Sequence, residues 1–288
     1  MMIKLKFISL LFLSLLFLDS SFSQIDFSTH QYFYTFPLNP AMAGMDDKAV
    51  ISFYRKNISS KNTILSGEFP SKILNSNIGI IINRNYNSSV SFVGKTTKNR
   101  LGLAYNYNFD FSDFARLRLG FQFTHIAATY DNFSTNIDAH WFTANDFNLG
   151  AVIISHNFKF GVGILNILNP TIDGKSSMHP LIDEKRNAVF TFSYNTILNQ
   201  KFELIPAMLI NIENKKVLVS DFSLYLNFRK KLFLGTTFRH GKNQRNKTIR
   251  NLIGLLGIHF KEKLIFQISI NPKNESNSYV QFLTQYKF

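Results

Sequence analysis

Apolar and polar residues alternate strictly through much of the chain. From residue 101 to 109 every odd position is Leu, Tyr or Phe, and every even position is Gly, Ala or Asn. From 117 to 123 the odd positions are again Leu or Phe, while Arg116 and Arg118 stand on the other parity. A period of two predicts β-strands with two different faces. Because a face carrying arginines cannot be buried in an apolar core, we expect lipid on one side and water on the other.

The same alternation recurs along the chain and predicts fourteen strands. Their expected bounds are Ala49–Lys56, Asn62–Phe69, Asn77–Arg84, Arg100–Phe109, Ala115–Ile126, Phe147–Ser155, Phe158–Asn166, Ala188–Ile197, Phe202–Asn211, Val219–Phe228, Lys231–Arg239, Asn251–Phe260, Lys263–Asn271 and Ser278–Phe288. The stretch Val90–Thr97 is interpreted as part of a loop, because single-chain bacterial barrels have an even number of strands.

The lengths of the predicted connections indicate a membrane barrel. Those after even-numbered strands are mostly very short, whereas four after odd-numbered strands are long. The long ones are Asn85–Asn99, Ala127–Asp146, Ile167–Asn187 and His240–Arg250. Outer-membrane barrels have short periplasmic turns and long outer loops, and a soluble β-sandwich has no reason to sort its loops in this way. We therefore predict an all-β, transmembrane antiparallel β-barrel over residues 47–288, in a bacterial outer membrane.

The last predicted strand fits this interpretation. Phe282, Tyr286 and Phe288 share one parity, and Gln281 and Gln285 lie on the other. A barrel in lipid must pair its last strand with its first to leave no open edge. We expect these aromatic residues to mark the barrel closure and to act as the signal for barrel assembly.

The N-terminus predicts export. Lys4 and Lys6 precede a twelve-residue apolar stretch, Phe7–Leu18, and Ser21 and Ser23 are small residues suited to cleavage before Gln24. Twelve apolar residues are too few to cross a bilayer as a helix, so an uncleaved anchor is disfavoured. Residues 1–23 are therefore predicted to be a cleaved signal peptide.

Composition restricts the possible partners. The 288-residue chain has no Cys and a formal charge of +14. Without thiols, disulfides and thiolate metal sites are excluded. The positive charge favours a phosphate-rich neighbour, and we expect lipid and lipopolysaccharide head groups rather than nucleic acid, because no basic helix or zinc-finger spacing is present. The cations that we expect in the lumen or at its rim are Arg116, Arg118, Lys159 and Arg239.

The basic stretch Arg239–Arg250 has two interpretations. On the outer rim it would meet lipopolysaccharide phosphates or an acidic partner, or it is simply a solvated loop.

Motifs for catalysis or metal binding are weak. None of the seven His residues forms a metal-type pair, and His140 beside Trp141 is expected to be a rim residue. Asp131, Asp138 and Asp146 share one loop but lack calcium-loop spacing. There is no Gly-x-Ser-x-Gly elbow or P-loop. We expect no enzyme activity, metal or cofactor.

Residues 24–46 form a separate N-terminal segment. The segment is rich in aromatic residues, and Pro37 and Pro40 exclude a regular strand or helix. We expect it to lie in the periplasm or to plug the lumen. Its motif Leu38-Asn39-Pro40-Ala41-Met42-Ala43-Gly44 resembles that of the PorP/SprF family of Bacteroidetes outer-membrane proteins. Looser matches follow in the family's order at Ile78–Asn83, Gly161–Pro170, Ile205–Met208 and Gly235–Arg239, although Gln24-Ile25-Asp26 departs from the usual Gln-Asp-Pro-like start.

The resemblance implies a role in the type IX secretion system, in gliding motility or in other secretion. Such proteins are thought to help secrete or to anchor large surface adhesins, whose C-terminal domain would dock at the barrel. Their periplasmic face, here including Asn39–Gly44, would meet periplasmic components of the system. The alternatives are a channel for small apolar or other ligands, resembling the long-chain fatty-acid transporter, and a soluble β-sandwich adhesin.

Overall fold

The computed structural model describes most of the chain after its N-terminal region. The described residues are 34–45, 48–57, 60–71, 75–87, 95–112, 114–131, 140–173, 180–213, 216–242, 248–261, 263–271 and 279–288. The predicted signal peptide, residues 24–33 and Asp138 lie outside them. No helix in these ranges is long and apolar enough to cross a membrane.

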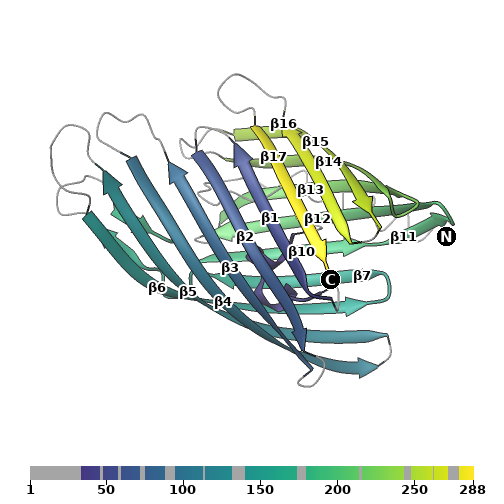
Figure 1. Ribbon diagram of the computed structural model, residues 1–288, viewed down its shortest axis with the longest axis horizontal. Helices are drawn as coiled ribbons and strands as arrows, with labels where there is room; N and C mark the ends of the chain where they lie inside the picture. The colour runs from purple at the N-terminus through teal and green to yellow at the C-terminus, as the bar shows by residue number, and fades with distance from the viewer. Residues whose placement is uncertain are drawn as a thin grey trace.

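The described strands form a closed antiparallel barrel with fourteen strand positions around its wall (Figure 1). The strands of the wall are β1 (Val50–Asn57), β2 (Ser60–Ser71), β3 (Ser76–Asn87), β4 (Lys95–Ser112), β5 (Ala115–Asp131), β6 (His140–Ser155), β7 (Phe158–Leu165), β10 (Asn187–Tyr194), β11 (Thr196–Asn199), β12 (Phe202–Glu213), β13 (Lys216–Phe228), β14 (Leu232–Lys242), β15 (Thr248–Phe260), β16 (Leu264–Asn271) and β17 (Tyr279–Lys287). β10 and β11 both pair with β12 and form one strand of the wall that is interrupted at Asn195. These fifteen strands therefore fill fourteen positions, and the predicted fold and strand number are confirmed.

The first and last strands close the barrel. β17 pairs with β1 from Val50↔Lys287 to Asn57↔Val280, and the Phe288 amide donates to the Ala49 carbonyl at 3.0 Å. Because no water in the hydrocarbon layer can satisfy an open strand edge, this pairing is what allows the sheet to lie in lipid.

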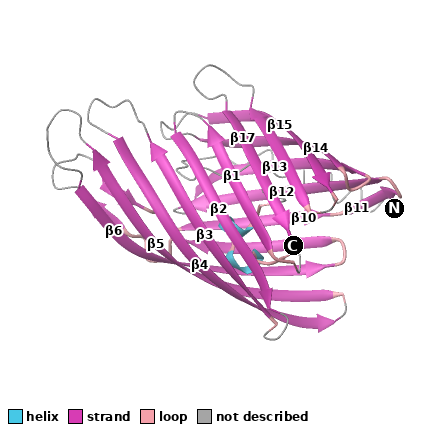
Figure 2. Cartoon of the chain, viewed as in Figure 1, coloured by secondary structure: helices cyan, strands magenta, loops and turns pink. Residues whose placement is uncertain are grey.

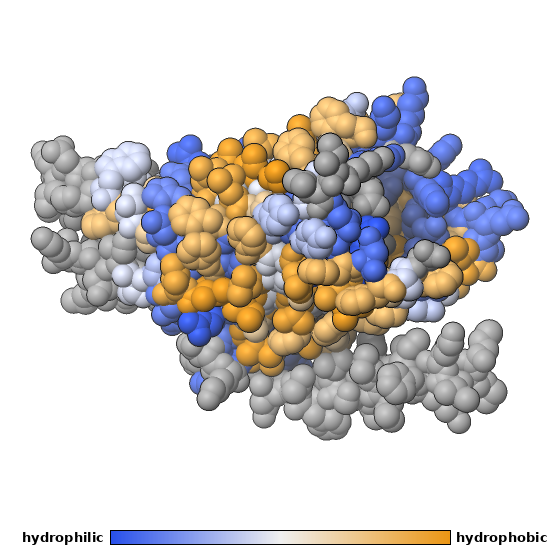
Figure 3. All heavy atoms as spheres, turned by 90° about the horizontal axis from the view of Figure 1, so that it is seen from below, coloured by the Kyte–Doolittle hydropathy of each residue, from blue (hydrophilic) through white to orange (hydrophobic). Residues whose placement is uncertain are grey.

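The outward face carries a belt of exposed apolar side chains (Figure 3). On β4 the belt runs from Leu101 to Phe111. Ten residues at about 3.3 Å each, tilted by about 40°, give a height of about 25 Å, which matches the lipid-facing band of outer-membrane barrels. The opposite parity carries buried polar residues such as Asn106, Asn108 and Gln122.

Connection lengths divide the two rims as predicted. On the rim near the C-terminus the connections are 72–75, 113–114, 156–157, 200–201, 229–231 and 261–263, each of two to four residues. The opposite rim holds the longer ones, including 88–94, 132–139, 166–186 and 272–278. The former rim is called the short-turn rim and the latter the outer rim; by the rule for such barrels, short turns face the periplasm.

The loop bounds on the outer rim were predicted wrongly. β4 begins at Lys95, β5 continues to Asp131 and β6 starts at His140, so much of Asn85–Asn99 and Ala127–Asp146 is strand. Residues 95–97, taken as part of a loop excursion, belong to β4; residues 88–94 are not among those described. Above the lipid the outward face no longer has to be apolar, so the alternation fades while backbone pairing continues.

A short hairpin lies within the predicted loop Ile167–Asn187. β8 (Thr171–Asp173) pairs with β9 (Pro180–Asp183) as a separate two-stranded sheet. This loop therefore has strand structure of its own.

Replacing Phe121 by Arg should test the position of the belt. Phe121 is 49% exposed and pairs with Tyr105, near the middle of the belt on β4, so we expect the charge to destabilise the folded barrel in bilayers by about 2–4 kcal/mol. Urea titration in lipid vesicles measures the change. Arg at Thr143, an exposed position beyond the belt, is the control and should cost less than about 1 kcal/mol; equal costs would contradict the assignment.

Candidate functional site

The chain before β1 lies inside the barrel. Residues 34–45, here called the inner segment, contain two short 3-10 turns, η2 (Phe36–Leu38) and η3 (Pro40–Met42), drawn in cyan in Figure 2. Pro40 starts η3, where its fixed φ suits the turn and its missing N–H is not needed. The Asn39 side chain caps η3 by accepting from the Ala41 amide at 3.0 Å. The prolines and Asn39 therefore shape this segment locally.

Asn39 also ties the inner segment to the wall. Its side-chain nitrogen donates to the carbonyl oxygens of Ala151 on β6 and Val162 on β7, each at 3.1 Å. Asn39 is 1% exposed, and these contacts satisfy both sides of its amide. An apolar residue here would leave buried carbonyls with one partner fewer.

A row of three glycines lets the inner segment approach the wall. Gly120, Gly150 and Gly163 are directly paired across β5, β6 and β7. A Cβ at Gly150 would overlap the Asn39 side-chain oxygen, and one at Gly120 or Gly163 would lie 2.5 Å from backbone atoms of residues 38–41. These glycines form a shallow trough in the lumen wall that accepts the backbone of Leu38–Ala41.

Gly44 is held at both of its peptide groups. Its N–H donates to the Glu68 carboxylate on β2 at 2.8 Å, and its carbonyl accepts from Arg118 on β5 at 3.1 Å. Its φ of +67° is in the left-handed region, and a Cβ would lie 2.7 Å from the Asn77 side chain. Both its backbone conformation and its surroundings therefore require glycine.

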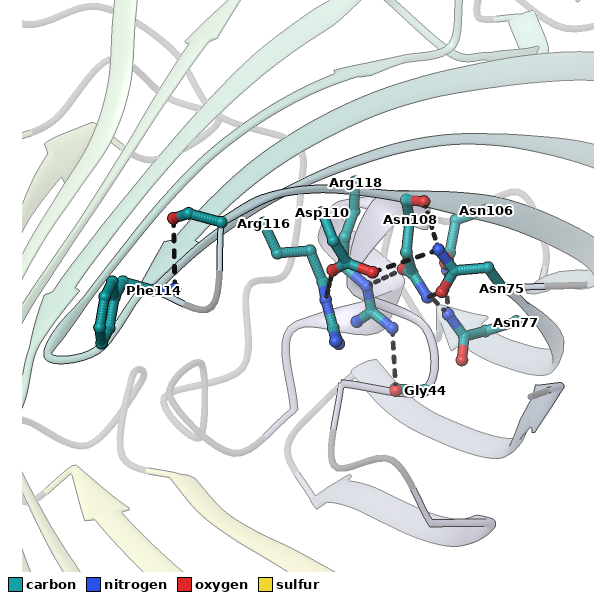
Figure 4. Close-up of polar contacts among 10 residues, drawn as sticks. Gly44, Asn75, Asn77, Asn106, Asn108, Asp110, Phe114, Arg116 and Arg118 are labelled. Atoms are coloured by element: carbon teal, nitrogen blue, oxygen red, sulfur yellow. Dashed lines mark hydrogen bonds and ion pairs between the residues drawn. The ribbon is translucent and has the colours of Figure 1, made fainter.

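Asparagines complete a polar cradle around this end of the inner segment (Figure 4). Asn106 donates to the carbonyls of Ala43 at 2.9 Å and Pro40 at 3.3 Å. Arg118, which is fully buried, also donates to the Asn108 side-chain oxygen at 2.6 Å. Hydrogen bonds from a buried guanidinium are stronger than neutral ones, so Arg118 is a principal anchor of Gly44.

Apolar contacts hold the inner segment to opposite sides of the lumen. Tyr34 and Phe36 pack among inward side chains of β1–β4 and β17, with the rings of Tyr34 and Tyr54 stacked at 6.1 Å. Leu38 packs against side chains of β7, β10, β12 and β13. Each fully buried side chain contributes about 2 kcal/mol. The inner segment thus bridges the lumen rather than lining one wall.

A cavity of about 230 Å³ remains between the inner segment and the wall formed by β1, β2, β7, β10 and β12–β17. Its apolar side includes Phe36, Met42 and Met45, which belong to the inner segment. The polar lining residues include Thr35, Glu68, Lys159, Thr191, Ser193, Glu203, Asn227, His259, Gln285 and Lys287. Many of these stand near strand ends at the short-turn rim, so the cavity lies toward that rim.

Ion pairs attach the segment after β9 to the barrel wall near the outer rim. Glu184, just after β9, accepts from Lys98 at 3.2 Å and from Arg100 at 2.5 Å, both on β4. Burial raises the pKa of the Glu184 carboxyl, but the charges and hydrogen bonds of Arg100 and Lys98 outweigh burial, so the pKa lies below its usual range. The β8–β9 hairpin is therefore anchored to the wall by an ionised carboxylate.

The structure places the predicted cations in four different settings. Arg116 pairs with Asp110 near the short-turn rim, and Arg118 holds the inner segment. Lys159 lines the cavity, and Arg239 binds Asp221 through two hydrogen bonds of 2.8 and 2.6 Å. These four cations are not one cluster.

The remaining predicted residues are also dispersed. The motif residues Leu38, Asn39, Pro40, Ala41, Ala43 and Gly44 are all buried inside the barrel. Phe282 and Tyr286 face outward on β17, and Phe288 follows it, 60% exposed. Asp146 accepts from the amides of Phe147 and Leu168. Among the residues that the structure describes, no three His, Asp or Glu side chains are grouped to hold a metal ion.

Adding a methyl group at Gly150 should loosen the inner segment. In Gly150→Ala the new Cβ would overlap the Asn39 side chain, and such overpacking costs about 1–3 kcal/mol. Since the chain has no Cys, an Ala41→Cys probe can report exposure by maleimide labelling. We expect faster labelling when Gly150→Ala is present.

Gly254→Ala is the matched control, because a Cβ there meets nothing within 4 Å. Retained heat-modifiable migration in gels shows that each variant folds. Labelling as slow in Gly150→Ala as in the control would contradict the role of the trough.

Acid should release the β8–β9 anchor. Because the folded pKa of Glu184 is lowered, its contribution is present above the ordinary carboxyl pKa and disappears as pH falls through the folded value. The Glu184 amide donates to the Pro170 carbonyl and the Arg186 amide to the Asn169 side chain. We expect their hydrogen-exchange protection, corrected for intrinsic rates, to fall in acid, and to be low at every pH in Glu184→Gln. Unchanged protection in both cases would count against the anchor.

Several solved structures resemble this fold at low identity. The CymD monoaromatic hydrocarbon channel has a TM-score of 0.57 and 9% identity, over 92% of this chain and 94% of that one. The Ralstonia pickettii toluene transporter TbuX has a TM-score of 0.52 and 10% identity, over 87% and 92%. The Acinetobacter baumannii outer membrane protein Omp33 has a TM-score of 0.51 and 10% identity, over 84% and 98%. These likenesses establish the barrel fold.

Sequence comparison identifies the family. No curated protein has a significantly similar sequence. The family model described as type IX secretion system membrane protein PorP/SprF matches residues 21–280, nearly the whole chain. With the closed barrel and the buried Leu38–Gly44 motif, this match shows that the chain belongs to the PorP/SprF family of type IX secretion system membrane proteins, as an outer-membrane β-barrel.

Proposed function

We propose that this barrel anchors a large secreted adhesin at the cell surface, or helps to secrete it, within the type IX secretion system. Membership of the family supports a role in secretion. The observation that carries the proposal is the inner segment, whose contacts reach opposite walls of the lumen. A barrel occupied in this way is suited to presenting surfaces to proteins rather than to passing solutes.

The two rims offer different surfaces to partners. At the outer rim, β4, β5 and β6 continue beyond the apolar belt, where Lys95 still pairs with Asp131 and Tyr130 with His140. A cargo domain at the cell surface would meet this wall and the β8–β9 hairpin. At the short-turn rim the cavity and the basic turn Arg229–Lys231 face periplasmic components. The proposed role in gliding motility or other secretion needs no catalytic group.

The motif Leu38–Gly44 lies inside the barrel and not on the periplasmic surface, where the family resemblance predicts contact with partners. Residues 38–43 are at most 7% exposed and Gly44 is buried, so the turn contacts the wall and not a partner. That expectation is therefore wrong for Asn39–Gly44, and the short turns themselves take its place in the proposal.

Export and assembly complete the proposed pathway. Cleavage of the signal peptide before Gln24 would release the mature chain into the periplasm. The outward aromatics Phe282, Tyr286 and Phe288 would then guide insertion by the assembly machinery, since they lie on the strand that closes the barrel.

A channel for small apolar ligands is the second candidate. The cavity of about 230 Å³ with its Phe, Met and Ile lining favours it, and two of the similar structures are named a hydrocarbon channel and a toluene transporter. Transport would require the inner segment to leave its trough or to shift within it.

Planar-bilayer conductance should separate the two candidates. We expect the full mature chain to be silent and a variant lacking residues 34–45 to conduct, because only the variant lacks the inner segment. A steady open channel from the intact chain, with ligand-dependent flux, would favour transport.

Gene deletion should test anchoring in cells. Without this barrel, the proposed adhesin cargo should lose attachment to the cell surface, as measured by surface immunolabelling and by its release into the medium. Re-expression of the intact chain is the control. Normal display of the adhesin in the deletion strain would contradict the proposal.

A further inference from the structure

Three cations stand on the outward face directly above the apolar belt. They are Arg55 on β1, Lys61 on β2 and Arg84 on β3, and all three side chains are exposed. Arg55 follows Phe53 by two positions and Arg84 follows Ile82 by two positions; Phe53 and Ile82 are the exposed large hydrophobic residues nearest the outer rim on β1 and β3. With the rise and tilt of barrel strands, they lie about 5 Å above the belt, and Lys61 lies about 10 Å above it.

Strand register brings the three cations together. Arg55 pairs with Thr63, which pairs in turn with Arg84, so the two arginines are two strand spacings apart, about 10 Å. Lys61 is on the same face of β2, two residues from Thr63 and between the arginines. Their long side chains can therefore converge on one ligand of moderate size.

No acidic side chain shares this face. On the outward parity of β17, β1, β2, β3 and β4, the described residues include no Asp or Glu. None of the three cations makes an ion pair or a hydrogen bond with a described side chain. Three like charges held this close repel one another, and an anion from outside the chain would offset that repulsion.

We propose that Arg55, Lys61 and Arg84 bind the phosphate group of an outer-leaflet lipid. The height of the cluster places it where lipid phosphates lie, and the outer rim places it in the outer leaflet. Arginine matches phosphate oxygens with paired N–H groups, and lysine adds a compact charge. Thr63 on β2 and Asn99 on β4 pair with Arg84 from the two neighbouring strands, and they supply neutral hydrogen-bonding groups.

The site is distinct from the lumen and from the cargo role. All three side chains point away from the inner segment, so the inference stands whether the barrel anchors an adhesin or transports a ligand. A lipid held on β1–β3 would lie beside the seam between β1 and β17 and would fix the rotation of the barrel relative to lipid-bound neighbours.

Lipid binding by the purified full-length mature barrel tests the proposal. The probes are bisphosphorylated lipid A, the same lipid A after phosphatase treatment, and phosphatidic acid, each titrated in detergent and followed by native mass spectrometry. We expect Arg55→Gln/Lys61→Gln/Arg84→Gln to raise the Kd for bisphosphorylated lipid A by roughly tenfold or more, from the loss of charge-assisted hydrogen bonds.

The matched control removes the same charges at the other rim. Arg229→Asn/Lys230→Asn/Lys231→Asn also loses three positive charges, one Arg and two Lys, in a turn where positive φ at Arg229 and Lys230 suits Asn. It should leave the Kd within about twofold of the unmodified barrel. If the triple variant does not fold, Arg84→Gln alone should give a smaller rise in Kd.

The outcomes distinguish the source of the phosphate. Tight binding of lipid A that phosphatase treatment abolishes identifies a glycolipid phosphate, and equal binding of phosphatidic acid supports the same site with a glycerophospholipid. Binding of dephosphorylated lipid A at the same Kd, or equal Kd values for the variant and the unmodified barrel, would overturn the proposal.

Discussion

The whole structure depends on the pairing of every backbone N–H and C=O group that meets lipid. A sheet can satisfy this requirement only by closing on itself, and here β17 closes onto β1 with a continuous register. Closure by fourteen strands then creates an interior that side chains of the wall alone do not fill. The inner segment fills part of this interior, since its aromatic and aliphatic side chains pack against inward residues that would otherwise meet water.

Two kinds of contact hold the inner segment in the lumen: close backbone packing at glycines and hydrogen bonds to charged side chains. On the side of β5–β7, glycines let backbone meet backbone, and Asn39 donates to carbonyls of the wall. On the side of β2 and β5, opposite charges hold the two peptide groups of Gly44. Hydrogen bonds to charged groups are worth more in a buried setting, so a few contacts position the segment without a large apolar core.

The strand number and the sorting of the rims were predictable, because alternation is a local property that survives without knowledge of the partner strand. The strand ends at the outer rim were not, because β4, β5 and β6 continue into water, where apolar alternation no longer marks a strand. The trough was also hidden in the sequence. Gly120, Gly150 and Gly163 are far apart in sequence, and only the register aligns them. Glu184 was missed for the same reason, since its partners lie more than eighty residues away.

The position of the inner segment just before β1 affects how the barrel forms. Only residues 46–49 separate it from the first strand, so the entropy of bringing it back to the nascent sheet is small. Its effective concentration at the wall is in the millimolar range from the moment that β1 is in place. We therefore expect the sheet to form around a segment that arrives with its first strand, so that β17 would close a barrel whose interior is already occupied.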